Sequence, residues 1–128
     1  MEATRSFAFP LLRFLRREER TALDAAQLKD SAAFRLAYAD EAAARAGAAA
    51  LTVDAGRMEQ FWRLLALMHR FGLPEPTAFA LTLTSAHSPE ALLALPRADV
   101  VAQLRKLPPL TGVYRSKTVR VDVVEAIS

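Results

Sequence analysis

The stretch at residues 55–71 places the strongest limit on how this chain can fold. Its apolar side chains recur on nearly every side of a helix, and only a narrow stripe that includes Glu59 and Arg63 is polar. Asp54 before it and Gly72 after it are typical of the two ends of a helix. A helix that is apolar on most sides must be buried on most sides. We therefore predict that 55–71 is the central core helix or a helix at a dimer interface.

The apolar surface of this helix exceeds what a small domain usually needs, and the excess favours a binding function. Such a surface can meet a partner protein or a second copy of the chain. The side chains expected at this interface are Phe61, Trp62, Leu65, Leu67 and Met68. The sequence thus predicts a small, non-catalytic accessory or regulatory protein of the cytoplasm that binds another protein and associates with itself, as in a homodimer.

Composition places the chain among globular proteins and removes several kinds of chemistry. The 128 residues are 52% hydrophobic and 24% charged, which fits a single globular domain over 1–128. The chain has no cysteine, so disulfides, thiolate metal sites and cysteine nucleophiles are excluded. Because it has only two histidines and scattered carboxylates, we expect no metal, no cofactor and no catalytic residue.

The N-terminal part is expected to contain two more helices before the apolar one. Pro10 suits the first turn of a helix, and the apolar residues from Leu11 onward follow a helical stripe. Ser31 is expected to cap a second, alanine-rich helix over 32–46, and Gly47 is expected to end it.

The C-terminal part changes from helical to alternating periodicity. Residues 78–84 and 118–126 alternate as strands do, and two short helices, 89–95 and 97–107, are expected between them. The sequence therefore predicts an α+β fold in which three helices precede a β-α-α-β unit. Its small sheet has two strands, or three if 113–116 adds a hairpin arm, and the sense in which the strands pair stays open.

The net charge of +3 is unevenly distributed, and this supports an alternative function. Residues 97–120 alone carry +5. Basic side chains of 105–120, gathered on a hairpin beside a tyrosine that stacks on a base, would form a nucleic-acid-binding module. The residues of this alternative site are Arg105, Lys106, Tyr114, Arg115, Lys117 and Arg120. The same cations can instead protect the edge of a sheet from pairing.

Two smaller features each have two interpretations. The loop at 84–88 contains His87 between serines, and it fits a small-ligand or enzymatic site as well as a plain turn with a serine cap. An arginine stripe near the N-terminus can hold phosphates or can be a solvated helical face. The stripe consists of Arg13, Arg16, Arg17 and Arg20.

The sequence offers no segment suited to a membrane. Pro10 and Arg13 interrupt the apolar residues near the N-terminus, so a secretory signal is not expected. Other uncharged runs, such as 77–89, are too short and too polar to cross a bilayer. We therefore expect a cytoplasmic protein with no membrane partner.

Overall fold

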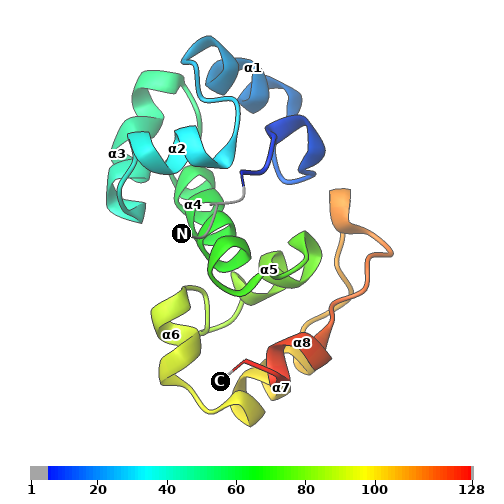
Figure 1. Ribbon diagram of the computed structural model, residues 1–128. Coiled ribbons are helices and arrows are strands. Elements are labelled where there is room, and N and C mark those ends of the chain that lie inside the picture. The colour runs from blue at the N-terminus through cyan, green and yellow to red at the C-terminus, as the bar shows by residue number, and fades with distance from the viewer. Residues whose placement is uncertain (1–5, 128) are drawn as a thin grey trace. The chain divides into compact units, whose positions relative to one another are not determined.

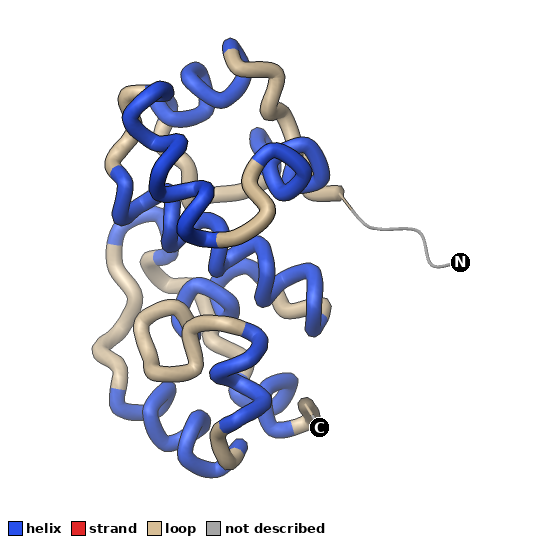
Figure 2. Tube along the Cα trace, turned by 90° about the vertical axis from the view of Figure 1, so that its left-hand side faces the viewer, coloured by secondary structure: helices blue, strands red, loops and turns tan. Residues whose placement is uncertain are grey.

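The computed structural model describes residues 6–127, and the regular elements in this part of the chain are all helical (Figure 1, Figure 2). β-type pairing among the described residues is confined to an isolated antiparallel bridge between Ala8 and Asp30. The predicted α+β fold is therefore wrong, and the described chain is all-α. The elements, with η marking a 3-10 helix, are η1 (Phe9–Leu11), α1 (Arg17–Ala25), α2 (Ser31–Ala37), α3 (Glu41–Leu51), α4 (Ala55–Phe71), α5 (Glu75–Leu81), α6 (Pro89–Ala94), α7 (Arg97–Lys106), η2 (Gly112–Tyr114) and α8 (Val121–Glu125).

The first predicted strand, 78–84, is wrong because most of it belongs to α5. Pro74 is the N-cap residue of this helix and has an extended backbone. Pro76 lies in the first turn, a position that suits proline. An apolar alternation over so few residues fits a helix as well as a strand, and the alanines favour the helix. The residues that α5 buries are Thr77, Ala78, Ala80 and Leu81.

The second predicted strand, 118–126, is also wrong, since its centre forms α8. Val124 is the buried residue of this helix, whereas the alternating valines before it are half-buried. The predicted hairpin arm at 113–116 is the turn η2 and the residues after it. This turn begins at Gly112, whose φ of 64° lies in the left-handed region that glycine adopts without strain.

Three of the predicted helices are confirmed. The apolar stretch 55–71 has the same bounds as α4. The helices expected over 89–95 and 97–107 are α6 and α7, which end one residue earlier than predicted. The Ser88 hydroxyl caps α6, because its oxygen accepts the Ala91 N–H at 3.1 Å.

The predicted helix from Leu11 is wrong in its start. Pro10 lies in the short turn η1, and α1 begins only at Arg17. The irregular chain between them places Phe14 and Leu15 in the core. The backbone N–H of Arg16 donates to Glu19 at 2.7 Å, which caps the new helix start.

The alanine-rich helix predicted over 32–46 is two helices, α2 and α3. Each begins with an aspartate cap: Asp30 accepts the Ala33 N–H at 2.9 Å, and Asp40 accepts the Ala43 N–H at 2.8 Å. The expected cap Ser31 is instead the first residue of α2. Asp40 therefore starts a new helix within the predicted range, in spite of the helix propensity of the alanines around it.

Gly47 lies within α3, so the prediction that it ends a helix is wrong. A Cβ atom at this position would stand 2.5 Å from Cε1 of Tyr38, which is closer than two carbons can approach. A larger residue at this position would therefore need the Tyr38 ring to move, so glycine is explained here by the close approach of that ring and not by a turn.

The chain divides into two compact units, Met1–Trp62 and Arg63–Ser128. The boundary falls within α4, which contributes residues to both. The prediction of one domain over 1–128 stays a prediction.

The core of the N-terminal unit is a cluster of aromatic rings around Phe61. Its ring centroid lies 5.2 Å from that of Phe9 and 5.1 Å from that of Phe34, both edge to face. Phe14 stacks on it at 5.4 Å. These are the favoured arrangements of aromatic pairs, and the four rings come from four separate segments of the unit. Phe61 thus joins η1, the irregular segment and α2 to the start of α4.

The C-terminal unit depends on hydrogen bonds between buried polar groups and distant segments. The Tyr114 ring lies 4.4 Å from that of Phe79, and its hydroxyl donates to Glu75 at 2.5 Å. The buried Thr77 hydroxyl oxygen accepts the backbone N–H of Arg120 at 2.9 Å. These two bonds fasten η2 and the segment before α8 to α5.

Candidate binding site

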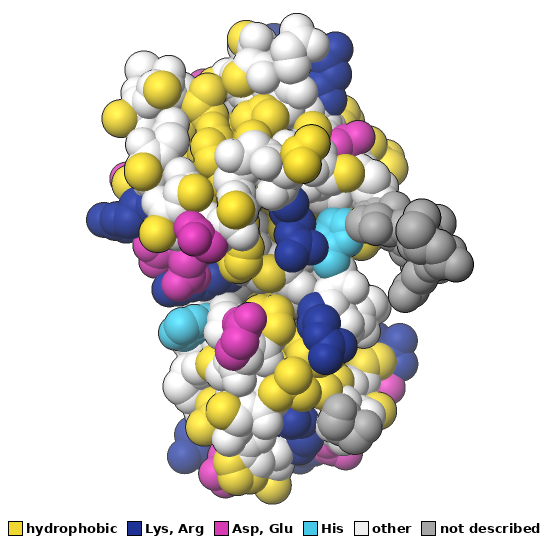
Figure 3. All heavy atoms as spheres, turned by 60° about the vertical axis from the view of Figure 1, so that its left-hand side comes forward, with side chains coloured by type: hydrophobic (Ala, Val, Ile, Leu, Met, Phe, Trp, Pro, Cys, Tyr) yellow, Lys and Arg dark blue, Asp and Glu magenta, His cyan; other side chains and the backbone are white. Residues whose placement is uncertain are grey.

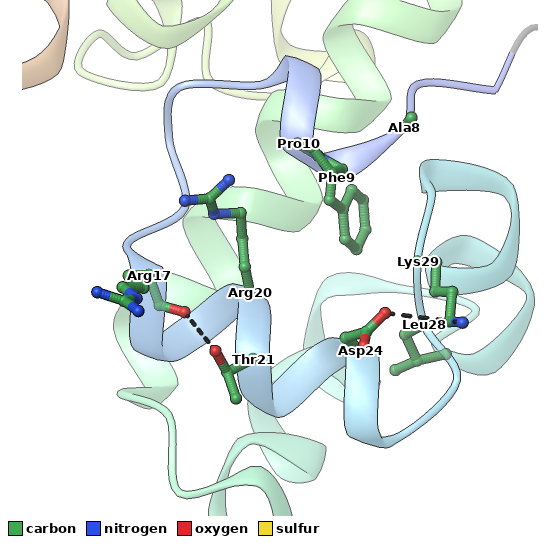
Figure 4. A pocket seen from close by; sticks show the side chains of 9 residues that line it. All are labelled: Ala8, Phe9, Pro10, Arg17, Arg20, Thr21, Asp24, Leu28 and Lys29. Atoms are coloured by element: carbon green, nitrogen blue, oxygen red, sulfur yellow. Dashed lines mark hydrogen bonds and ion pairs between the residues drawn. The ribbon is translucent and has the colours of Figure 1, made fainter.

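A hollow of about 480 Å³ lies beside α1 within the N-terminal unit, and Figure 4 shows its lining. The lining comes from the segment around η1, from one face of α1 and from the turn that follows α1. We call it the α1 hollow. Its lining residues are Ala8, Phe9, Pro10, Arg17, Arg20, Thr21, Asp24, Leu28 and Lys29.

The apolar wall of the α1 hollow is formed by buried side chains on two segments that are bonded to each other. Phe9 and Leu28 are almost fully buried, with exposed fractions of 2% and 8%. The Phe9 N–H donates to the Lys29 carbonyl oxygen at 3.1 Å, which holds the two segments side by side. Gln27, with a φ of 66°, turns the chain sharply after α1 and brings Leu28 back toward it.

One face of α1 supplies the polar lining. Arg17, Arg20 and Asp24 recur at three- and four-residue spacing, so their side chains leave the same side of the helix. The adjoining side of the helix carries the buried residues Glu19 and Leu23. With α1 in this orientation, the side chains of Arg17 and Arg20 line the hollow, whereas those of Glu19 and Leu23 lie in the core.

A buried ion pair fixes that orientation. The Arg57 Nε and Nη2 atoms donate to the two carboxylate oxygens of Glu19 at 2.6 and 2.7 Å. Nη2 also donates to the Phe14 carbonyl oxygen at 2.8 Å, and the guanidinium lies 4.3 Å from the centroid of the Phe14 ring. A two-pronged contact of this kind holds both side chains in a single geometry.

The same contacts lower the pKa of Glu19. Burial alone raises the pKa of this carboxyl, but it is outweighed by the hydrogen bonds from Arg57 and from the Arg16 backbone, and by the charges of both arginines. The pKa of Glu19 therefore lies below its ordinary value, and the group is a carboxylate at neutral pH.

The four charged side chains of the α1 hollow comprise three cations and one carboxylate. Lys29 and Asp24 approach each other to 3.8 Å, but about two thirds of each side chain is exposed, so this contact is weak. Thr21 donates its hydroxyl to the Arg17 carbonyl oxygen at 3.0 Å and has no acidic or basic partner in the lining. The lining is thus apolar and positively charged.

Arg20 stands out among the cations of the lining. Its Nε atom is buried, and it has no hydrogen-bond acceptor among the described residues. Figure 4 shows its side chain rising from α1 toward η1. A buried donor without an acceptor is uncommon in folded proteins, because it loses its hydrogen bonds to water and forms none within the protein, which lowers stability.

The arginine stripe inferred from the sequence is divided by the structure. Arg17 and Arg20 line the α1 hollow, whereas Arg13 and Arg16 precede the helix and do not. Sequence reasoning missed the rest of the site, in particular Phe9, Leu28 and Lys29. The turn at Gln27 that brings the last two to the hollow has no signal in its residue type.

The predicted interface residues of 55–71 are enclosed by the chain itself. Phe61, Leu65 and Leu67 are fully buried, and Met68 is 5% exposed. Trp62 is half-buried, and its indole N–H donates to the Tyr38 carbonyl oxygen at 3.0 Å. Apart from Trp62, these residues are therefore buried in the chain, and their role at an interface stays a prediction, as does self-association.

The residues of the nucleic-acid alternative do not form one exposed cluster of free groups. Tyr114 is 2% exposed and packs on Phe79, so its ring presents no face to a base. Arg105 pairs with Glu125 at 3.8 Å, and Arg120 pairs with Asp122 at 2.6 Å. Three cations remain exposed with no ion pair among the described residues, namely Lys106, Arg115 and Lys117.

The hydroxyl groups of the loop 84–88 are occupied by partners within the chain. Thr84 donates to the Leu81 carbonyl oxygen at 2.8 Å, and the Ser85 hydroxyl and backbone N–H both contact Gln103. Ser88 caps α6. His87 is half-buried, and its Nδ1 atom has no hydrogen-bond partner among the described residues. The loop therefore has the structure of a helix-connecting turn.

Exposed apolar side chains are distributed over several elements. On the face drawn in Figure 3, apolar, basic and acidic side chains of the described residues are intermingled. The large apolar residues with the greatest exposure are Leu11, Leu36, Leu83, Leu93 and Val113.

The comparisons with known proteins add no relative to this picture. No family model matches the chain, and no match was found among curated proteins or solved structures. Between residues 6 and 127, no helix has the length and apolar character that crossing a membrane requires. In the same part of the chain, histidine and carboxylate side chains form no group of three that could hold a metal ion.

Proposed function

We propose that the protein is a non-catalytic binding module of the cytoplasm that recognises a segment of another protein in the α1 hollow. The observation that carries this proposal is the lining itself, in which buried apolar residues adjoin three cations and a single carboxylate. A segment with an apolar side chain beside acidic residues is complementary to it in both shape and charge.

The distribution of exposure within the hollow supports a protein partner. Phe9 and Leu28 are buried at the wall, while Arg17 and Lys29 are exposed. An apolar centre with a charged, hydrated rim is the usual anatomy of a protein–protein interface. Leu11 follows the lining residue Pro10 and is 80% exposed.

Short blocked peptides test the proposal. The first has a central leucine between glutamates, and its matched control has the same leucine between lysines. Each is titrated into 15N-labelled protein at physiological salt, and backbone amide shifts are followed. We expect the glutamate peptide to shift the amides of residues 8–29, with an affinity that falls as salt rises because surface charges are screened.

The lysine peptide is expected to bind at least tenfold more weakly, since it meets a lining of its own charge sign. Equal binding of the two peptides would contradict the proposal, as would shifts confined to residues outside 8–29. Sedimentation of the protein alone shows whether a second copy is itself a partner, because the self-associating form would depend on concentration.

A further inference from the structure

The three cations of the α1 hollow are not equivalent. Arg17 and Lys29 are exposed, so their charged groups are hydrated. A contact with a ligand replaces that water, and the net free energy gained is small. Arg20 is half-buried with a dehydrated Nε atom that has no acceptor among the described residues. A ligand oxygen placed on this donor would form a charge-assisted hydrogen bond with it. Because Nε is already removed from water in the ligand-free chain, binding would carry no further cost for its desolvation.

The shape of the guanidinium group indicates which anion it would hold. Nε and one terminal nitrogen form a planar pair of donors, and the two oxygens of a carboxylate match that pair. The lining carries three cations against the single carboxylate of Asp24, so its net charge favours an anion.

We infer that Arg20 is the specificity-determining residue of the α1 hollow and that it holds one carboxylate of the partner side-on through Nε and a terminal nitrogen. Nε is covered in the ligand-free chain, so the guanidinium turns toward the hollow as the carboxylate enters. The turn gives the unpartnered donor an acceptor. This inference rests on the proposed function, because it names the group that the bound segment must carry.

A double-mutant cycle tests the inference with changes on both sides of the contact. Arg20→Gln is expected to weaken binding of the glutamate peptide by about 10- to 100-fold, the range of a charge-assisted hydrogen bond. A peptide with glutamine in place of the glutamates is expected to bind weakly to both proteins, with less than about a threefold difference between them.

Two further variants distinguish the contribution of the planar pair of N–H donors from that of the positive charge. Arg20→Lys keeps the charge but lacks the planar pair, so we expect it to lose nearly as much affinity as Arg20→Gln. Arg115→Gln, at an exposed arginine outside the α1 hollow, is the control, and we expect a change below about threefold. In the wild-type protein, the Arg20 Nε–H resonance is expected to shift on addition of the glutamate peptide and to stay in place with the glutamine peptide.

The peptide design also identifies the source of the carboxylate. One peptide carries internal glutamates with an amidated end, and another has neutral side chains with a free C-terminal carboxylate. Tight, Arg20-dependent binding of either one supports the inference and assigns the source.

Several results would overturn it. Equal losses for the glutamate and glutamine peptides in Arg20→Gln would show that Arg20 only supports the fold. An unchanged Arg20 Nε–H resonance in the wild-type protein would overturn it without any variant. If the glutamate peptide shifts the amides of 8–29 without dependence on Arg20, only this inference fails. If no peptide shifts those amides, the proposed function fails too.

Discussion

The arginines at the candidate site of the N-terminal unit differ from several arginines of the C-terminal unit in whether they have partners. In the N-terminal unit, Arg17 and Arg20 line the α1 hollow, and Nε of Arg20 is without an acceptor among the described residues. In the C-terminal unit, Arg105 and Arg120 pair with nearby carboxylates. The guanidinium of Arg97 donates to three backbone carbonyl oxygens, those of Leu92, Leu95 and Ile127. Within 97–120, the arginines Arg97, Arg105 and Arg120 thus have partners in the chain, whereas Arg115 has no ion pair among the described residues.

The cores of the units differ in a related way. The N-terminal core is an aromatic cluster centred on Phe61, with one buried ion pair beside it. The C-terminal unit fastens its last segments through single polar contacts, such as those of Tyr114 and Thr77. Loss of one aromatic ring should therefore cost more stability than loss of one hydrogen bond.

The largest effect is expected for Phe61→Ala. Removing a fully buried ring that contacts three others should lower the free energy of unfolding by about 3–5 kcal/mol. Denaturation followed by circular dichroism measures this loss. Leu36→Ala is the matched control, because Leu36 is 88% exposed and its replacement should change stability by less than about 0.5 kcal/mol. A loss below 1 kcal/mol for Phe61→Ala would show that the aromatic cluster is not the centre of this core.

The next largest effect is expected for Glu19→Gln, which leaves the charge of Arg57 without its partner. Because both side chains are mostly buried, the free energy of unfolding should fall by about 2–3 kcal/mol at neutral pH. A variant as stable as the wild type would show that the pair does not hold α1 in place.

The pH dependence of the same pair has a defined sign. The pKa of Glu19 is lower in the folded chain than in the unfolded one, so the folded state gains stability above the unfolded pKa. That gain is lost as the pH falls from about 4.3, the ordinary glutamate value, through the lowered pKa. The stability difference between the wild type and Glu19→Gln should therefore shrink on acidification. A difference that is constant between neutral pH and about pH 3 would contradict this.

A smaller effect is expected for Tyr114→Phe in the C-terminal unit. The variant keeps the ring on Phe79 but loses the hydrogen bond to Glu75, so stability should fall by about 1–2 kcal/mol. Urea denaturation measures the change. A loss as large as that of Phe61→Ala would remove the contrast between the two cores.

The smallest effect is expected for Arg105→Gln. The Arg105–Glu125 pair is exposed on both sides, so its loss should change stability by less than about 0.5 kcal/mol. The affinity for the glutamate peptide should change by less than about twofold, since Arg105 is not part of the α1 hollow. A larger loss of affinity would place the acidic segment on the C-terminal unit.

The sequence predicts the long elements of this fold better than the short ones. The apolar stretch 55–71 defines α4 to the residue, because seventeen residues of helical pattern leave no competing interpretation. The alternation over 78–84 is too short to distinguish a strand from the helix α5. The cap Asp40 also splits the helix over 32–46 that alanine content predicts as continuous.

The candidate site could be predicted only in part. The spacing of Arg17 and Arg20 places both on one helical face, and this holds in the structure. The sequence contains no sign that the chain turns at Gln27 and returns Leu28 and Lys29 to that face. Whether a cation is already paired depends on such tertiary contacts, and a charge count over 97–120 does not include them.

The central claim is that Arg20 of the α1 hollow, and not Arg105 of the basic C-terminal segment, binds the acidic segment of the partner. Calorimetric titration of the glutamate peptide into the wild type, Arg20→Gln and Arg105→Gln at one salt concentration tests it most directly. We predict that Arg20→Gln loses about 10- to 100-fold in affinity while Arg105→Gln stays within about twofold of the wild type. Equal losses in the two variants, or a larger loss in Arg105→Gln, would contradict the claim.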